Sequence, residues 1–175
     1  MLKNISFQPS RIEKSTPTSI ISVIYRVYHM ELDLYRPGFL LYTDRHALMT
    51  SDGTTTHLIA GNSTEDGYKE GVGAEARCDV RVGFAQISEK LVVVADHFNR
   101  CLRLIDRTTN NTSEFSGLCR EYSGYQDGGP GRFNGPESAV IDKRNKNQLL
   151  IVDRYNKSVR TVNVSSRVVD TFVES

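Results

Sequence analysis

The sequence predicts an all-β protein, a partial or open β-propeller with about three four-stranded blades. Three observations support this prediction. A long segment recurs at a spacing of 57 residues. Each copy holds four short runs rich in Val, Ile, Leu and Thr, as β-strands are. None of the copies shows the apolar periodicity of a helix.

The repeat is clearest in two copies. Each copy has a glycine-rich loop, then an apolar run that ends in aspartate, then a polar turn and another apolar run. The loops begin at Gly67 and Gly124 and the aspartates are Asp96 and Asp153, so both pairs are 57 residues apart. A weaker copy precedes them, in which the run FLLYTD ends in Asp44.

These copies divide the chain into an N-terminal extension, residues 1–26, which has no repeat match, and a propeller segment, residues 27–175. The expected blades cover residues 27–61, 82–117 and 137–173. Strands are expected at 27–33, 39–44, 47–52 and 56–61, then at 82–88, 91–96, 101–106 and 112–117, and finally at 137–142, 148–153, 159–164 and 168–173. The dipeptide Asp52-Gly53 is a hairpin signal between two of these strands.

The two clear copies resemble the NHL repeat family. The resemblance rests on the aspartate that ends the second strand, an asparagine three residues later, and an apolar residue followed by arginine. Those residues are Asp96, Asn99, Leu102 and Arg103 in one copy, and Asp153, Asn156, Val159 and Arg160 in the other. The loop Gly124-Tyr125-Gln126-Asp127-Gly128 is also similar to the family's. With its cysteines, the chain looks most like secreted or cell-surface animal members.

The resemblance implies a protein-binding propeller. Some members of the family bind RNA, and one branch is a metal-dependent amidating lyase. Propellers of this family usually close with more blades than the three expected here. An open set leaves two sheet faces bare. We therefore expect the chain to be part of a longer one with further blades, or to receive the missing blades from another molecule.

The turn between the second and third strands has two interpretations. Asp96, Asn99 and Arg103, like Asp153, Asn156 and Arg160, fit a structural role, in which the polar side chains bond nearby backbone groups and the arginine pairs with the aspartate. The residues between them are better candidates for contact with a ligand, because no structural role demands them. With the loop tyrosines they form the expected binding rim: Tyr68, His97, Phe98, Arg100, Tyr125, Arg154, Tyr155 and Lys157.

No catalytic or metal site is expected. The glycine-rich loops lack the Gly-Lys-Ser/Thr of a phosphate-binding loop. The position that carries a histidine metal ligand in the lyase branch holds Leu48, Arg100 and Lys157 instead. We therefore expect a protein that is not an enzyme and carries no cofactor, with the lyase and the RNA-binding propeller as the alternatives.

Composition limits the partners further. Hydrophobic residues make up 38% of the chain and charged residues 25%, as in an average soluble protein. The formal net charge is +1, without the basic excess of a nucleic-acid-binding domain. The chain has no apolar run long enough to span a bilayer. We expect an unidentified protein partner, with neither nucleic acid binding nor membrane insertion.

The cysteines and sequons favour the secretory route, although no signal peptide is visible. Cys101 opens a strand and Cys119 follows its neighbour's end, so they meet at one end of a hairpin and can form a disulfide. The alternative is a pair of buried thiols, and Cys78 is left over in either case. The sequence also has six possible glycosylation sites: Asn4, Asn62, Asn110, Asn111, Asn156 and Asn163. We therefore expect an extracellular or cell-surface protein.

Overall fold

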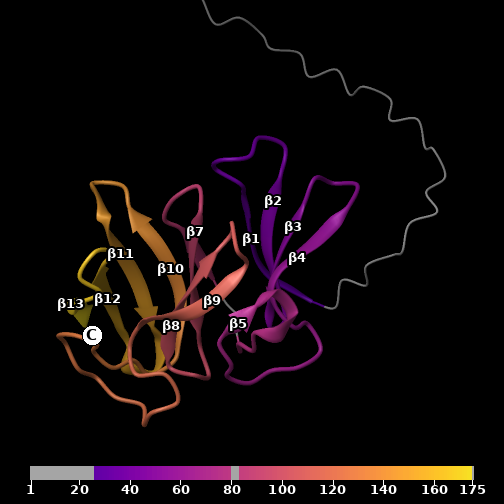
Figure 1. Cartoon of the computed structure of the whole chain (residues 1–175). Helices are drawn as coiled ribbons and strands as arrows, with labels where there is room; N and C mark the ends of the chain where they lie inside the picture. The colour runs from indigo at the N-terminus through magenta and orange to yellow at the C-terminus, as the bar shows by residue number, and fades with distance from the viewer. Residues whose placement is uncertain (1–25, 80–82, 175) are drawn as a thin grey trace, which may run out of the picture.

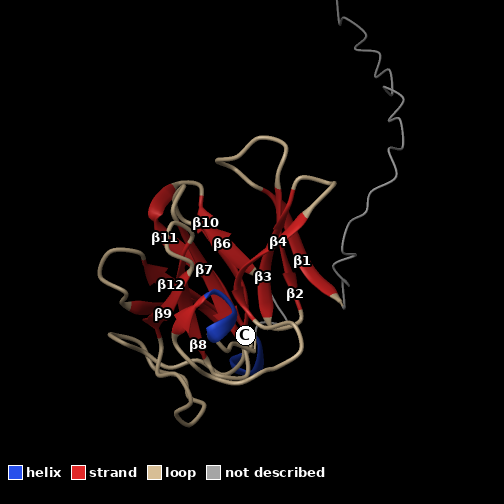
Figure 2. Cartoon of the chain, turned by 45° about the vertical axis from the view of Figure 1, so that its right-hand side comes forward, coloured by secondary structure: helices blue, strands red, loops and turns tan. Residues whose placement is uncertain are grey.

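The computed structural model describes residues 26–79 and 83–174. Those residues form three antiparallel sheets (Figure 1). Among these described residues, helical structure is limited to the 3₁₀ turns η1 (Gly73–Glu75) and η2 (Arg154–Asn156), which are blue in Figure 2. In the described part of the chain, no helix is long and apolar enough to cross a bilayer. The all-β prediction is confirmed in this form, as three sheets of four or five strands.

Each sheet is a meander whose strands follow chain order. The first sheet contains β1 (Val27–Leu32), β2 (Leu40–Asp44), β3 (Ala47–Ser51) and β4 (Thr56–Gly61). The second contains β6 (Phe84–Gln86), β7 (Leu91–Asp96), β8 (Cys101–Asp106) and β9 (Asn111–Ser116). The third contains β10 (Pro136–Asp142), β11 (Asn145–Asp153), β12 (Ser158–Asn163) and β13 (Val169–Glu174). Short turns join consecutive strands because antiparallel neighbours need only a hairpin connection.

The second sheet has a fifth strand that the repeat pattern did not predict. Strand β5 (Gly71–Val72) pairs antiparallel with β9 through Gly71 and Thr112. A strand of two residues within a glycine-rich loop has no alternation of apolar and polar residues, so no sequence signal marks it. The loop before the second sheet therefore covers that sheet's outer edge.

The hydrophobic core consists of two layers, one on each side of the second sheet. Between the first and second sheets lie Leu41, Leu48, Ile59, Ala60, Cys78, Phe84, Val92, Val94 and Ile105. Between the second and third sheets lie Ala85, Val93, Ala95, Leu102, Phe115, Phe133, Ala139, Leu149, Ile151, Val162 and Val169. Neighbouring residues of β7 thus belong to different layers, because side chains alternate across a strand. The second sheet is buried on both faces, and each of the others packs one face on it.

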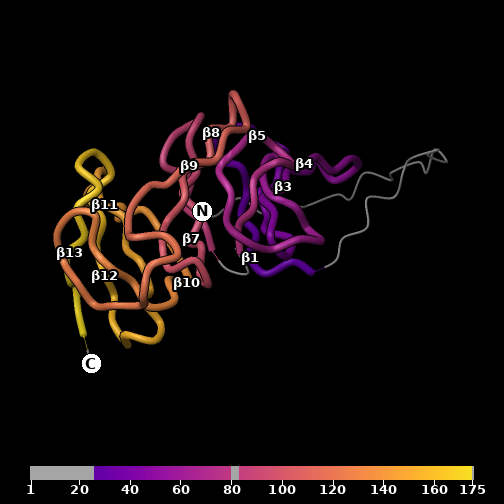
Figure 3. The backbone as a smooth tube through the Cα atoms, turned by 60° about the horizontal axis from the view of Figure 1, so that its bottom comes forward, coloured from indigo at the N-terminus to yellow at the C-terminus, as the bar shows by residue number. Residues whose placement is uncertain are grey.

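Both long inter-sheet connections lie at one end of the molecule. The loops that cross from the first sheet to the second and from the second to the third run along the bottom of Figure 1. Figure 3 views this end and shows the two loops in front of the strands. The β7–β8 and β11–β12 turns belong to the same end, because Arg120 N donates to Asn99 O at 2.9 Å and Tyr155 N to Asn134 O at 3.0 Å. We call this end the loop face.

Candidate functional site

A network of hydrogen bonds surrounds Asp96 at the end of β7. Its carboxylate accepts from Asp79 N at 2.8 Å, from Asn99 Nδ2 at 2.8 Å and from Arg103 at 3.3 Å. Asn99 also donates to Gly67 O at 2.8 Å. Asp96 and Arg103 are fully buried. This network connects the inter-sheet loop to β7 and β8.

The same network recurs 57 residues later around Asp153. Its carboxylate accepts from Asn134 N at 2.8 Å, from Asn156 Nδ2 at 2.7 Å and from Arg160 at 3.2 Å. Asn156 donates to Gly124 O at 2.8 Å, as Asn99 does to Gly67. The Asp and Arg of each repeat are therefore buried, and the half-buried Asn99 and Asn156 are engaged in hydrogen bonds within the fold.

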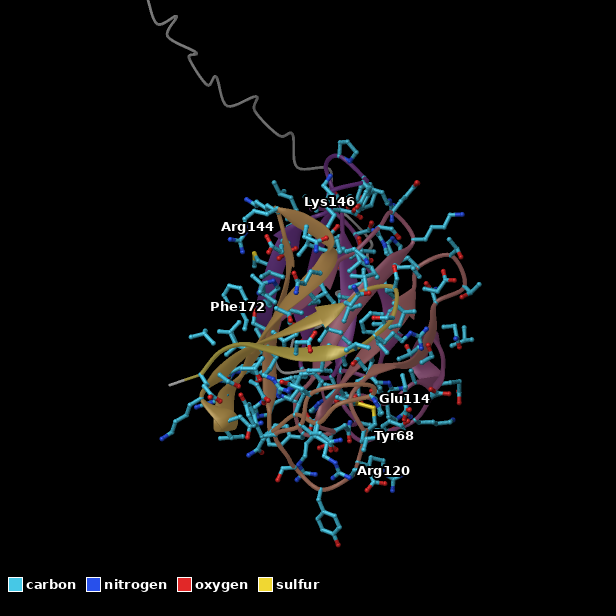
Figure 4. All side chains as sticks on the ribbon, turned by 90° about the vertical axis from the view of Figure 1, so that its left-hand side faces the viewer. Tyr68, Glu114, Arg120, Arg144, Lys146 and Phe172 are labelled. Atoms are coloured by element: carbon cyan, nitrogen blue, oxygen red, sulfur yellow. A yellow bond between two sulfur atoms is a disulfide. The ribbon has the colours of Figure 1, made fainter. Side chains whose placement is uncertain are left out.

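The loop tyrosines belong to this structural arrangement as well. The Arg103 guanidinium carbon lies 4.6 Å from the centre of the Tyr68 ring, and that of Arg160 lies 4.5 Å from the Tyr125 ring. The Tyr68 hydroxyl donates to Glu114, and Figure 4 shows these two side chains together at the loop face. The Tyr125 hydroxyl donates to Glu174 Oε2 at 2.6 Å. Each tyrosine thus covers an arginine and contacts the last strand of its sheet's meander, β9 or β13.

Burial affects the titration of these groups. Desolvation raises the pKa of Asp96 to about 6, although its hydrogen bonds and Arg103 favour the ionised form. Burial also raises the pKa of Asp153. Desolvation and the neighbouring Glu114 carboxylate raise the pKa of Tyr68 to about 12, so its phenol stays protonated and can donate. All three shifts therefore arise from the structural network.

The first sheet has a reduced form of the network. Asp44 accepts from Arg26 N at 2.7 Å, which corresponds to the bonds from Asp79 N and Asn134 N. Only Arg45 and His46 separate β2 from β3, and Arg45 has φ 53°. This turn is too short for the Asn and Arg of the longer turns, which explains why the first copy is weak in the sequence.

Two aromatic side chains of the predicted rim are exposed at the turns of neighbouring sheets. Phe98 in the β7–β8 turn is 51% exposed, and Tyr155 in the β11–β12 turn is 56% exposed. His97 lies between them, with its ring centre 4.7 Å from that of Phe98 and 5.6 Å from that of Tyr155. We call Phe98, Tyr155 and the neighbouring Arg154 the aromatic patch.

His97 differs from the expectation that it would be a contact residue on the rim. It is only 5% exposed, and its Nδ1 lies 3.3 Å from Pro136 O. Its place in a polar turn indicated exposure, but the groups that cover it come from the next repeat. His97 is therefore the buried support of the aromatic patch.

The basic residues of the predicted rim surround the same turns. Arg154 pairs with Glu137 at 2.8 Å, and its guanidinium carbon lies 5.5 Å from the Tyr155 ring centre. Arg100 is half-buried and donates to Glu121 O at 3.2 Å, whereas Lys157 is exposed. Arg100 and Lys157 occupy equivalent left-handed positions, with φ 62° and 52°.

The disulfide expected between Cys101 and Cys119 is present, with the Cα atoms 5.0 Å apart. It connects the first residue of β8 to the loop that leads to the third sheet. Cys78 is a free cysteine and is buried between the first and second sheets. Burial raises the pKa of its thiol far above the ordinary value, so the thiolate form that reacts is suppressed.

The sequons occupy different environments. Asn111 is exposed at the start of β9, and Asn62 and Asn110 are half-buried in loops. The side-chain nitrogen of Asn156 already makes two hydrogen bonds, and the side-chain oxygen Oδ1 of Asn163 accepts from Ser165 N at 3.0 Å. A glycan on Asn156 Nδ2 would leave one N–H and remove at least one of the bonds to Gly124 and Asp153, so glycosylation there conflicts with the structural role of Asn156. Asn4 lies outside the described residues.

A cluster that the repeat comparison did not single out contains His46, Asp66 and Asp79, whose possible ligand atoms lie within 4.8 Å of one another. His46 Nδ1 is 2.9 Å from Asp79 Oδ1, and both side chains are almost fully buried. His46 follows β2 and Asp79 precedes the second sheet, so the contact ties the first two sheets together. Its groups could hold a cation, and a buried contact between His46 and Asp79 explains the same geometry.

Comparison with known proteins adds information on the fold. No family model and no curated protein matches the sequence. A *Bacteroides thetaiotaomicron* protein of unknown function matches with a TM-score of 0.62 and 21% identity, over 70% of this chain and 32% of that one. An auxiliary nutrient-binding protein from the same organism has a TM-score of 0.62 and 22% identity, over 77% and 35%. One from *Bacteroides ovatus* has a TM-score of 0.54 and 18% identity, over 79% and 34%.

The chain therefore spans about a third of the length of these structures. At this identity, the likeness shows a shared fold. Together with the three successive sheets, it supports a propeller-like all-β architecture.

Proposed function

We propose that this chain is part of an NHL-type β-propeller and binds a protein partner through the aromatic patch on its loop face. In this proposal the three sheets are three blades, and the protein is a scaffold without catalytic activity. The single observation that carries the binding site is the exposed pair Phe98 and Tyr155, held on a buried histidine where two blades meet.

The chemistry of the patch favours a protein ligand. Aromatic rings and arginine dominate the binding energy of protein interfaces, because they provide much contact area for few rotatable bonds. The structural network around Asp96 and Asp153 uses Asp, Asn, Arg and the loop tyrosines, and it includes neither the Phe98 nor the Tyr155 side chain. The supporting turns are rigid, because β7 and β11 anchor them at Asp96 and Asp153, so little conformational entropy is lost on binding.

The two alternative functions lack comparable support. A lyase-type centre needs histidine ligands in matching positions around the axis, and Arg100 and Lys157 occupy these positions in the second and third sheets. An RNA-binding face needs a basic surface, whereas the chain has a net charge of +1. The two *Bacteroides* proteins described as nutrient-binding support a binding role in general.

An extracellular or cell-surface location is part of the proposal. The disulfide between Cys101 and Cys119 supports it, because such bonds persist mainly in oxidising compartments. The exposed sequon at Asn111 is compatible with glycosylation in that compartment.

Site-specific photo-crosslinking tests the binding surface. A photoreactive phenylalanine analogue at position 98 should crosslink a defined protein from cell-surface or extracellular extracts, and Tyr155→Ser should abolish that crosslink. The same analogue at Tyr35, which is exposed in the β1–β2 connection, is the matched control. Equal crosslinking from both positions, or a crosslink insensitive to Tyr155→Ser, would contradict the proposal. Salt-dependent binding of single-stranded RNA that requires Arg154 would favour the RNA alternative.

A further inference from the structure

The two faces of each sheet have different partners along the chain. We call the face toward the next sheet the forward face and the opposite one the backward face. The forward face of the second sheet carries Ala85, Val93, Ala95, Leu102 and Phe115, all buried because the third sheet covers them. The backward face of the second sheet carries Phe84, Val92 and Val94, which pack on the first sheet.

The third sheet repeats this forward face, but none of the described residues covers it. Val140 is equivalent to Ala85, because Val140 pairs with Leu150 and Ala85 with Val93. Val152 is equivalent to Ala95, because Val152 pairs with Val159 and Ala95 with Leu102. Phe172 lies 57 residues after Phe115, at an equivalent bulge. Val140, Val152 and Phe172 are 45%, 42% and 54% exposed. Figure 4 shows Phe172 at the side of the third sheet.

The first sheet has the complementary surface, a backward face on which Tyr42 is buried but the edge strand β1 is exposed at Met30 and Leu32. Met30 is equivalent to Phe84, because Met30 pairs with Tyr42 and Phe84 with Val94. Leu32 is equivalent to Gln86, because Leu32 pairs with Leu40 and Gln86 with Val92. Met30 is 59% and Leu32 70% exposed. Met49 and Leu58 continue this apolar face across the sheet, because Met49 pairs with both Tyr42 and Leu58.

We propose that the forward face of the third sheet is covered by the backward face of the first sheet of a second copy of this chain. The forward-to-backward contact already occurs twice inside the chain, so the contact between copies continues an established interface. Among the described residues, the first sheet has the one bare backward face, so a second copy provides the complementary surface. Two copies arranged reciprocally bury both apolar faces of each chain and close a ring, whereas a one-way contact would grow as an open polymer.

The mass of the 175-residue chain in solution, measured by light scattering over a range of concentrations, tests this assembly. We expect twice the chain mass. Phe172→Asp on the forward face and Met30→Asp on the backward face should each give monomers, because every contact in a homodimer of either variant then contains a buried aspartate. Val72→Asp changes a valine that is 54% exposed on β5, outside both faces, and should leave the dimer intact.

Mixing the two monomeric variants gives a sharper test. The intact forward face of Met30→Asp can meet the intact backward face of Phe172→Asp, so the mixture should recover heterodimers through one contact. A monomeric wild-type chain at every concentration would overturn the proposal, as would an open polymer. A dimer lost in Phe172→Asp but retained in Met30→Asp would show a forward-to-forward contact and would overturn it too. Circular dichroism spectra identical to wild type establish that each variant is folded.

Discussion

At the residue scale, the buried pair of Asp96 and Arg103 explains why the repeat has its Asp-x-x-Asn pattern. A buried aspartate needs several donors, and here a backbone N–H, an asparagine amide and a guanidinium provide them. The arginine in turn donates to the aspartate, to the loop carbonyl of Lys69 and to the Ser113 carbonyl of β9, and a tyrosine covers it. One set of polar residues thus fixes the loop, the turn and two strands.

Removing the arginine should therefore be costly. We expect Arg103→Met to lower the free energy of unfolding by about 3–5 kcal/mol, because it leaves the Asp96 charge buried without its cation. Urea denaturation followed by circular dichroism measures this loss. Arg100→Met, in the adjacent turn, should change stability by no more than about 0.5 kcal/mol. Equal losses in the two variants would mean that the buried pair has no special role.

The raised pKa of Asp96 predicts a pH dependence of stability. The carboxyl titrates near 3.8 in the unfolded chain and near 6 in the folded one, so the folded protein binds more protons between these values. The contribution of this group to stability is therefore complete below pH 3.8 and is lost as the pH rises through about 6. Asp96→Asn cannot titrate, so the stability of wild type relative to this variant should fall between pH 4 and 6. If the stability of wild type relative to Asp96→Asn instead rose with pH in this interval, the pKa of Asp96 would be lowered in the folded protein.

Thiol reactivity distinguishes the three cysteines. In the native protein without reductant, no cysteine should react rapidly with iodoacetamide, because Cys78 is 2% exposed and the other two are bonded to each other. Denaturant alone should expose Cys78, and denaturant with reductant should expose all three. Mass mapping of the alkylated peptides measures each step. Rapid native alkylation of Cys78 would show that the first two sheets separate readily.

At the scale of elements, the last strand of a sheet ends where a glycine allows the chain to turn across to the next sheet. Gly117 has φ +87°, and a Cβ there would lie 2.8 Å from the Phe133 ring and 3.2 Å from Cys101 Cα. Gly61 holds the equivalent place as the last residue of β4, with φ +95° and His46 O at 2.2 Å from such a Cβ. Only glycine meets the conformational and spatial demands of these positions.

Alanine at Gly117 should accordingly destabilise the protein by about 2–4 kcal/mol, from the left-handed backbone and the overlap with Phe133. Gly53→Ala separates these two causes. Gly53 has the same φ of +87° but no atom within 4 Å of the added Cβ, so only the backbone cost of about 1–2 kcal/mol should remain. Thermal and urea unfolding of the two variants provide the comparison. Similar losses would mean that close packing at Gly117 adds nothing.

At the scale of the whole molecule, the sequence predicted the features that depend on residues close together in the chain, such as the bounds of individual strands. Strands β4, β7 and β8 have the expected bounds, because alternating apolar residues and turn signals lie within each repeat. The short strand β5 and the burial of His97 depend on partners far along the chain, Thr112 and Pro136. The contact of His46 with Asp79 was missed for the same reason, since it joins residues from different repeats.

The order of the three sheets also determines which parts of the molecule unfold together. In the part of the chain that the structure describes, each core layer joins the second sheet to one outer sheet, so stability should be approximately a sum of sheet and nearest-neighbour terms. Loss of one layer should free one outer sheet without releasing the other. Hydrogen exchange is the suitable measurement, because it reports local opening of each sheet separately.

Two phenylalanines test this prediction as a matched pair. Phe84 is buried in the layer between the first and second sheets, and Phe133 in the layer between the second and third. Each change to alanine should cost about 3–5 kcal/mol. In Phe84→Ala, the amide of Leu41 in the first sheet should exchange faster while that of Ile151 in the third stays protected, and Phe133→Ala should show the reverse. Equal acceleration of both amides in either variant would mean that the three sheets open as one cooperative unit, and the nearest-neighbour description would not hold for this chain.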